Sequence, residues 1–150
     1  MDGCDDERYI RRAMHLAAQA QADGDVPIGA VLVSGDAVLE AKNEKERRAD
    51  PTAHAEILLL QRAAHELRAW RLCDATLYVT KEPCVMCAGA MVAARIKRLV
   101  YGCSDPKGGA AGSVLDVTQH PALNHRIEVT RGVLGDETAA QLQTFFRNRR

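Results

Sequence analysis

The residues best suited to chemistry in this chain lie in two short motifs, His54-Ala55-Glu56 and Pro83-Cys84-Val85-Met86-Cys87. One imidazole and two thiolates are ligands that zinc prefers, and they number one fewer than a closed structural zinc site uses. The fourth coordination position is therefore left for water, as in a catalytic zinc site. Glu56 is not needed to complete the ligand set, so its carboxylate is free to move protons. The motifs predict one catalytic zinc ion per chain, held by His54, Cys84 and Cys87.

The spacing within each motif predicts that both stand at the start of a helix. His54 and Glu56 are two residues apart, so in mid-helix their side chains would point about 200° away from each other. Both can reach one ion from the first turn, and the Asp-Pro-Thr at residues 50–52 offers an N-cap and a helix-starting proline. A proline also precedes Cys84 and Cys87, whose i, i+3 spacing brings both sulfurs to one side. The positive ends of two helix dipoles would then favour thiolate over thiol.

A Cys-x-x-Cys pair has two other common explanations. It can be a redox pair, although a thioredoxin-like site would not need a His-x-Glu motif about thirty residues upstream. It can also belong to a structural zinc site, which requires a fourth ligand. Cys73 and Cys103 lie in or beside apolar segments, where cysteine is commonly a small buried hydrophobe. His65 would lie about 16 Å from His54 along a helix, too far to bind the same ion. The open site is therefore the preferred interpretation.

The composition indicates a single globular domain over residues 1–150. A chain of 150 residues is long enough to bury about two-thirds of its surface. Hydrophobic residues make up 47% of it, yet no apolar run approaches the roughly eighteen residues of a membrane-spanning helix. The acidic start is unlike a signal peptide, and five cysteines, two of them assigned to the metal, do not suggest a disulfide framework. We therefore expect a cytoplasmic protein with no membrane association.

The charge of the chain is balanced overall but unevenly distributed. Lysine and arginine together number 20, as do aspartate and glutamate, which argues against a non-specific nucleic-acid binder. Residues 1–56 carry 7 basic and 12 acidic side chains, whereas residues 95–150 carry 9 and 5. A basic C-terminal third suggests a local contact with an anion. Ordinary solvated surface charge explains the same pattern, so the composition leaves both possibilities open.

Hydrophobic periodicity and turn residues predict nine elements around the two motifs. Helices are expected at residues 5–22 (capped by Asp5 or Asp6), about 52–67, 84–95 and 136–147, and strands at 28–33, 37–41, 75–80, 99–103 and 127–130. Residues 43–49 and the glycine-rich segment 104–113 are expected to be loops. The order predicts a mixed sheet with helices on both faces, an antiparallel hairpin, and parallel strands where a helix joins them. Ligands are expected beyond the C-terminal ends of the parallel strands, where the helix at Cys84 begins.

Seven segments of the chain resemble the bacterial tRNA adenosine deaminases, a family of the cytidine deaminase-like superfamily. They are residues 26–33, 50–56, 74–80, 82–91, 109–113, 124–126 and 145–147. The zinc motif marks the nucleobase deaminases as a whole, whereas the last three segments point to the tRNA branch. The resemblance implies an α/β protein with a three-layer α/β/α fold around a mixed five-stranded sheet. It also implies hydrolytic deamination of adenosine to inosine at the wobble position of a tRNA anticodon loop, by a homodimer.

The resemblance also assigns roles to individual residues. His54, Cys84 and Cys87 correspond to the zinc ligands, and Glu56 to the proton shuttle for zinc-activated water that attacks C6 of adenine. Asn43 corresponds to the asparagine that hydrogen-bonds the target base. Further contacts to the anticodon stem-loop are expected from Asp105, Lys107, Asn124 and Arg147, with Arg149 and Arg150 as the last basic residues of the chain.

Two other functions remain open. A small-base deaminase acting on guanine or cytosine would share the whole zinc apparatus, and the zero net charge suits it. A non-catalytic, zinc-stabilised RNA-binding subunit would share the ligands but would have no use for Glu56, which disfavours it.

Overall fold

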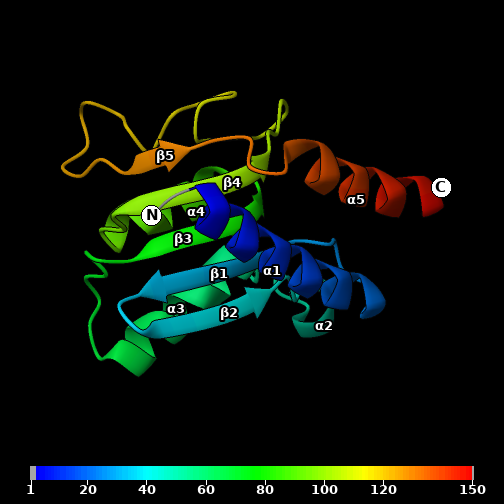
Figure 1. Cartoon of the computed structure of the whole chain (residues 1–150), viewed down its shortest axis with the longest axis horizontal. Helices are drawn as coiled ribbons and strands as arrows, with labels where there is room; N and C mark the ends of the chain where they lie inside the picture. The colour runs from blue at the N-terminus through cyan, green and yellow to red at the C-terminus, as the bar shows by residue number, and fades with distance from the viewer. Residues whose placement is uncertain (1–2, 150) are drawn as a thin grey trace.

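The computed structural model describes residues 3–149, in which five helices and five strands form around one sheet (Figure 1). The helices are α1 (Gly3–Ala22), α2 (Lys45–Arg48), α3 (Ala55–Leu67), α4 (Val85–Ala93) and α5 (Gly135–Asn148). The strands are β1 (Gly29–Ser34), β2 (Ala37–Lys42), β3 (Thr76–Lys81), β4 (Arg98–Cys103) and β5 (Glu128–Thr130). All nine predicted elements are present, with ends shifted by a few residues. Arg150, one of the expected RNA contacts, lies outside the described residues.

The sheet is mixed, and its strand order is β2-β1-β3-β4-β5. β1 pairs antiparallel with both of its neighbours, so that Ala30 lies opposite Ala41 on β2 and Val79 on β3. β3 pairs parallel with β4, and β4 pairs parallel with β5. The prediction of an antiparallel hairpin is confirmed by β1 and β2, and that of parallel strands joined through a helix is confirmed by β3 and β4.

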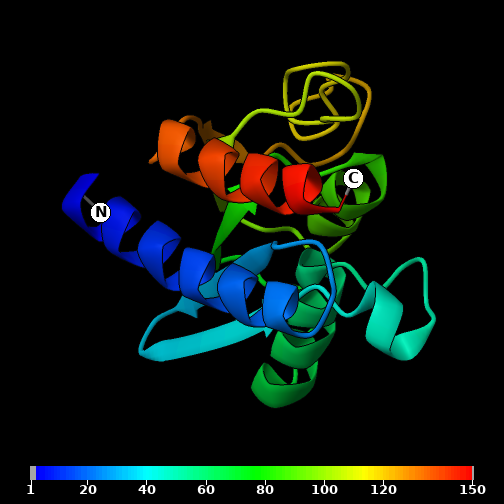
Figure 2. The same cartoon turned by 90° about the vertical axis from the view of Figure 1, so that its right-hand side faces the viewer.

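Helices cover both faces of the sheet and produce the three layers seen from the side in Figure 2. α1 packs on the face that carries Tyr78. α5 lies alongside α1, where Gln141 Nε2 donates a hydrogen bond to the Met14 carbonyl at 2.9 Å. α3 and α4 pack on the opposite face, which carries the neighbouring residue Leu77. Because side chains alternate along a strand, a continuously apolar strand such as β3 supplies both layers. The predicted α/β/α fold is confirmed.

The close contact of α1 with β1 depends on a glycine at position 29. A Cβ added to Gly29 would lie 2.0 Å from the Ala13 carbonyl oxygen and 2.8 Å from the Ala17 nitrogen, both of them backbone atoms of α1. A packed helix backbone cannot move aside without disturbing the rest of its layer. The glycine therefore lets the helix lie directly on β1, the strand that separates β2 from β3.

The start of α1 differs from the prediction. Asp5 and Asp6, expected as N-caps, lie within the first turn of the helix. The carboxylate of Asp6 is buried and accepts two hydrogen bonds from Arg98 of β4, at 2.9 and 2.7 Å. The capping prediction is wrong because a partner 92 residues further along the chain holds this side chain.

The segment expected as a loop at residues 43–49 is also more ordered than predicted, since it contains α2. The buried side chain of Asp25 fixes it there: Oδ2 accepts a hydrogen bond from the Glu46 backbone N–H at 2.9 Å, and Oδ1 accepts one from Val26. A four-residue helix is too short to show hydrophobic periodicity, and none of its residues is buried. The sequence therefore contained no signal for it.

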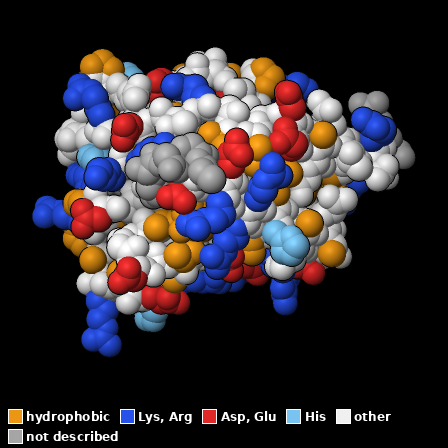
Figure 3. All heavy atoms as spheres, in the orientation of Figure 1, with side chains coloured by type: hydrophobic (Ala, Val, Ile, Leu, Met, Phe, Trp, Pro, Cys, Tyr) orange, Lys and Arg blue, Asp and Glu red, His pale blue; other side chains and the backbone are white. Residues whose placement is uncertain are grey.

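The molecular surface on the side of α1 is of mixed charge. Figure 3 shows Lys and Arg side chains interspersed with Asp and Glu over this face. Side chains of opposite charge also pair, as Arg12 does with Glu40 and Lys42 with Asp23. Interspersed charges of both signs do not produce a broad field of one sign. Among the described residues, none of the helices is both long enough and apolar enough to span a membrane.

Candidate active site

His54 is the residue immediately before α3, the N-cap position of that helix, and its backbone is extended. The Asp-Pro-Thr segment in front of it forms a tight turn in which Asp50 Oδ1 accepts a hydrogen bond from the Thr52 backbone N–H at 2.8 Å. The Thr52 carbonyl in turn accepts one from the His54 N–H at 2.8 Å. The prediction that Asp50 or Thr52 caps the helix is therefore wrong, because the side chain of Asp50 stabilises the turn. The turn thus places His54 at the N-terminus of α3.

The two cysteines stand in the equivalent place on α4. Cys84 is the N-cap residue, and Cys87 lies in the first turn and is buried. Pro83 consequently precedes the cap and lies outside the helix. All three ligand candidates thus sit at helix N-termini, where the positive end of the dipole favours a thiolate.

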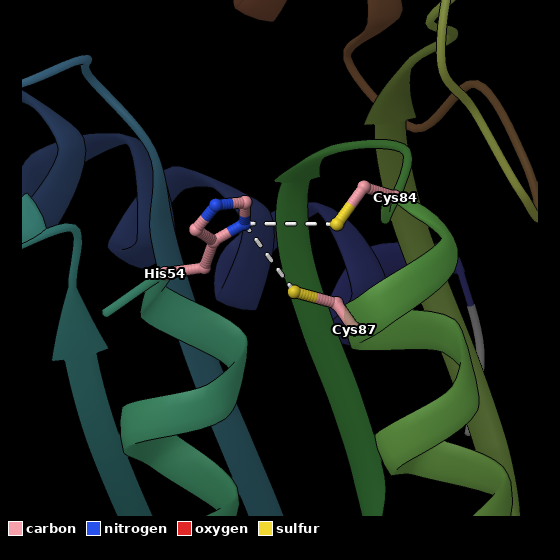
Figure 4. A group of neighbouring side chains, drawn as sticks. All are labelled: His54, Cys84 and Cys87. Atoms are coloured by element: carbon pink, nitrogen blue, oxygen red, sulfur yellow. Dashed lines mark hydrogen bonds between the residues drawn. The ribbon is translucent and has the colours of Figure 1, made fainter. Parts of the chain in front are cut away.

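The three side chains converge on one point between the two helices (Figure 4). His54 Nδ1 lies 3.7 Å from Cys84 Sγ and 3.5 Å from Cys87 Sγ, and the three ligand atoms lie within 4.8 Å of one another. Zinc bonds of about 2.0–2.1 Å to nitrogen and 2.3 Å to sulfur require an N···S separation of about 3.5 Å in a tetrahedral site. The observed separations therefore fit a zinc ion, and the predicted grouping of these residues is found in the structure.

The two thiols interact strongly with each other. The pKa of Cys84 is lowered to about 3, chiefly because the Cys87 thiol hydrogen-bonds to it and then because His54 does so. The pKa of Cys87 is raised, first because it donates that hydrogen bond and second because it is buried. Both shifts favour deprotonation of Cys84 over that of Cys87, and a metal ion bound by both sulfurs would displace the proton of Cys87 as well.

Glu56 lies in the first turn of α3 and points into the protein, not toward solvent. The residue is 4% exposed, and its Oε1 atom has no hydrogen-bond partner among the described residues. Burial is the main cause that raises the pKa of this carboxyl group. Buried polar atoms are rarely left unpaired unless a water, ion or ligand completes them. An unpaired carboxyl oxygen beside three metal ligands is suited to exchange a proton with a water molecule.

Asn43 is buried at the end of the second strand and is tied to α3. Its side-chain Oδ1 accepts a hydrogen bond from the Ala55 backbone N–H at 2.8 Å, which satisfies a free donor at the start of that helix. The side chain is thereby held next to His54 and Glu56. Because Oδ1 is engaged, a hydrogen bond to a substrate would come from the Nδ2 group.

The predicted RNA contacts lie outside this cluster and differ in their surroundings. The carboxylate of Asp105 accepts hydrogen bonds from the backbone N–H groups of Lys107 and Gly108, at 3.0 and 3.2 Å, and forms an ion pair with Lys81 at 3.2 Å. Burial by itself would raise the pKa of Asp105, but these partners lower it on balance. Asp105 thus shapes its own loop, whereas the side chain of Lys107 is exposed. Asn124 and Arg147 are exposed as well, on the loop before β5 and on α5.

One feature of the site was missed from the sequence. A cavity of about 340 Å³ opens beside the ligand cluster and is lined by Lys45, Glu46, Ala49, Asp50, Pro51 and His54. Most of these residues belong to α2 and the turn that follows it. In a segment expected to be a loop, polar residues that line a cavity have the same types as polar residues exposed to solvent. The sequence therefore could not reveal the cavity.

Known proteins with similar sequences are deaminases. The sequence profile of the MafB19-like deaminases matches residues 4–150. The tRNA-specific adenosine deaminase of Haemophilus influenzae is 48% identical over 147 residues, which cover 97% of this chain and 85% of that protein. The tRNA-specific adenosine deaminase of Bacillus subtilis is 46% identical over 146 residues, which cover 97% of this chain and 91% of that protein.

Solved structures agree with the sequence matches. A structure from a study of A-to-I editing by tRNA:A34 deaminases at the wobble position superposes with a TM-score of 0.86 at 42% identity, covering 90% of this chain and 99% of that one. Guanine deaminase from Nitrosomonas europaea superposes with a TM-score of 0.76 at 25% identity, covering 93% and 83%. The fold and the His-Cys-Cys cluster define a deaminase of the cytidine deaminase-like superfamily. The identity to tRNA-specific adenosine deaminases extends over nearly the whole chain. The chain therefore belongs to that family.

Proposed function

We propose that this chain catalyses the hydrolytic deamination of adenosine to inosine at the wobble position of a tRNA anticodon loop. The observation that carries the proposal is the cluster of His54, Cys84 and Cys87 beside the buried Oε1 of Glu56, an atom with no hydrogen-bond partner within residues 3–149. That cluster supports deaminase chemistry, and the 48% identical relative supports tRNA as the substrate. We further propose that residues 1–150 form a single domain and that the enzyme acts in the cytoplasm, where tRNA is used.

The three ligand residues would hold one zinc ion through His54 Nδ1 and the sulfur atoms of Cys84 and Cys87. When bound, zinc supplies Lewis-acid activation of a water molecule. Glu56 Oε1 would accept a proton from the water as the water oxygen bonds to C6 of adenine, and would pass that proton to the purine ring nitrogen. The proton of the new hydroxyl group would then pass through Glu56 to the amino group, and the C6–N bond would break to release ammonia. A carboxyl group whose pKa is raised by burial holds the proton between these transfers more readily than a solvated one.

Asn43 is proposed to orient the adenine. Its Oδ1 is fixed by the Ala55 N–H, so the amide is held in one orientation with Nδ2 as the group for the base. A base reaches such a buried site only after leaving the stack, which costs less in a single-stranded loop than in a duplex. An anticodon loop meets this requirement. The exposed side chains of Lys107 and Arg147 are proposed to contact its phosphates, together with Asn124 at the surface.

A small-base deaminase is the second candidate, because the guanine deaminase from Nitrosomonas europaea shares the fold with a TM-score of 0.76. The two functions are separated by product analysis of the zinc-loaded protein. The substrates are an anticodon stem-loop with adenosine at the wobble position, the same stem-loop with guanosine there, and free adenosine, guanine and cytosine. We expect inosine from the first RNA and no product from the others. Xanthine formed from free guanine would favour the second candidate, and no product from any substrate would indicate a non-catalytic RNA-binding subunit.

We propose that two copies of the chain form a homodimer through the outer faces of α3 and α4. A largely apolar groove of about 410 Å³ lies there, lined by Ile57, Leu60, Gln61, Ala64, Trp70, Ala90, Ala93 and Ala94. Trp70 is 59% exposed at its edge. A contiguous apolar patch rimmed by polar residues is typical of an interface, and in a two-fold dimer the same patch serves both partners.

A further inference from the structure

The buried carboxylate of Glu82 takes no part in the proposed chemistry, yet it is surrounded by hydrogen-bond donors. Glu82 follows β3 and is 2% exposed. Its Oε1 accepts hydrogen bonds from the Asp105 N–H, at 3.0 Å, and from the Ser113 hydroxyl. Its Oε2 accepts hydrogen bonds from the N–H groups of Ala111 and Ser113, both at 3.0 Å. All four donors come from the glycine-rich loop at residues 104–113, so this one side chain is hydrogen-bonded to both ends of that loop.

The same short segment leads into the metal site. Glu82 lies two residues before the ligand Cys84, and its backbone N–H donates to the Cys103 carbonyl at 2.9 Å. The carbonyl of the intervening Pro83 accepts a hydrogen bond from the Ala110 N–H at 2.9 Å. The loop is therefore attached to the chain on which Cys84 sits by both backbone and side-chain bonds.

The loop also approaches the carboxylate too closely for any side chain at its centre. A Cβ added to Gly109 would lie 2.3 Å from Glu82 Cδ and 2.5 Å from each carboxylate oxygen. At the adjacent Gly108 the nearest atom would be Asp105 Oδ2 at 3.5 Å, which is ordinary contact. The two neighbouring glycines therefore differ in the space that surrounds them. Only Gly109 must lack a side chain for the loop to approach Glu82 this closely.

The loop bonded to Glu82 contains Lys107. The Asp105 N–H is bonded to Glu82 Oε1, and the Asp105 carboxylate in turn accepts the N–H groups of Lys107 and Gly108. The ion pair between Asp105 and Lys81 steadies the same turn. A continuous chain of hydrogen bonds therefore runs from Glu82 to the residue proposed to contact RNA.

We infer that Glu82 is a positioning residue, which holds the loop 104–113 at a fixed place relative to Cys84 so that RNA bound at Lys107 presents its base to the metal site. The inference rests on the proposed function. Glu82 is not a catalytic residue, because both oxygens of its carboxylate are occupied by loop donors. Its contribution is the relative placement of two sites that lie on different segments of the chain.

The test is a double-mutant cycle between Glu82→Gln and Lys107→Ala in the zinc-loaded protein, with the anticodon stem-loop as substrate. Glutamine keeps the size of the side chain but turns an amide NH₂ toward N–H donors, so the bonds on one of the two oxygens are lost. We expect Glu82→Gln to raise KM for the stem-loop about tenfold or more, with zinc content unchanged. We also expect the factor by which Lys107→Ala raises KM to shrink toward one when Glu82→Gln is already present, since the effects of coupled residues are not additive.

Two further variants and a matched control keep the test decisive if Glu82→Gln folds poorly. Ser113→Ala removes only the hydroxyl donor and should raise KM by a smaller factor. Gly109→Ala should raise KM as Glu82→Gln does, because the added Cβ pushes the loop away from the carboxylate. Gly108→Ala is the matched control, and its KM should equal that of the parent protein. Additive effects of Glu82 and Lys107, an unchanged KM, or loss of zinc along with activity would each overturn the inference. Absence of inosine with the parent protein would overturn the proposed function as well, so the two failures are distinguishable.

Discussion

Replacing Glu56 by glutamine should abolish most of the catalysis without weakening the fold. The substitution preserves the shape of the side chain but removes the group that accepts and returns the proton. General acid–base catalysis contributes about 10²–10⁴-fold, which corresponds to about 2.7–5.4 kcal/mol of activation free energy at 1.36 kcal/mol per tenfold. We therefore expect kcat for the stem-loop to fall by at least about a hundredfold. The zinc content should stay at one ion per chain, since the proposed ligands are His54, Cys84 and Cys87.

The expected effect on stability has the opposite sign from that of an ordinary core mutation. Glu56 is 4% exposed, and its Oε1 has no partner among the described residues. A buried polar atom without a hydrogen bond costs about 1–3 kcal/mol, and more when it is charged. A neutral amide is less costly to bury than a carboxylate. The Tm of Glu56→Gln should therefore equal or exceed that of the parent, by about 2–4 °C for each kcal/mol gained in a protein of this size.

Three measurements on one preparation check this prediction: single-turnover deamination, zinc by elemental analysis, and thermal unfolding by circular dichroism. The matched control is Glu66→Gln, which changes the same chemical group on the exposed side of α3. It should leave all three quantities unchanged. Loss of zinc from Glu56→Gln would show that Glu56 is a ligand, and a Tm well below the parent value would show that the carboxylate has a stabilising partner. Either result refutes the reasoning.

Four other predictions follow from the site and the surface. Replacing the ligand in Cys87→Ser should lower zinc content well below one per chain and lower the Tm, because metal binding stabilises the folded state; full activity without metal would contradict the zinc assignment. Asn43→Ala should cost about 1–3 kcal/mol of unfolding free energy, measured by urea denaturation, because the Ala55 N–H loses its partner; an unchanged midpoint would count against that bond. Ala93→Glu, in the groove of α3 and α4, should convert a dimer of the 16.4 kDa chain to monomer in sedimentation; a parent protein that is already monomeric would exclude the dimer. Lys107→Ala and Arg147→Ala should each flatten the slope of log affinity against log salt by about 0.7, with melting curves to detect a loss of packing; unchanged slopes would remove these residues from the RNA contact.

Much of the site could be predicted because its chemistry is encoded locally. The types of His54, Cys84 and Cys87 predict a zinc site, and their positions relative to a helix start follow from a few neighbouring residues. Glu56 could be assigned because one histidine and two cysteines already supply the three protein ligands of an open zinc site, which leaves its carboxylate free. The alternation of apolar helices and strands likewise indicated a mixed sheet with helices on both faces, which the structure confirms. The local capping predictions were less successful, because Asp50 stabilises a turn and Asp6 binds Arg98.

Other features were decided only by the tertiary structure. The strand order places β1 between β2 and β3, and this arrangement brings the starts of α3 and α4 together, so that His54 lies within reach of Cys84 and Cys87. The chain also folds so that Glu82 meets the N–H of Ala111, 29 residues further on, and Asp6 meets Arg98 after 92 residues. Such pairings arise when compaction brings segments distant in sequence into contact, and buried polar groups must then find partners wherever the packing places them. The sequence by itself therefore predicted the metal ligands and the proton carrier, whereas only packing decided how the loop that carries Lys107 is held beside the segment that leads to Cys84.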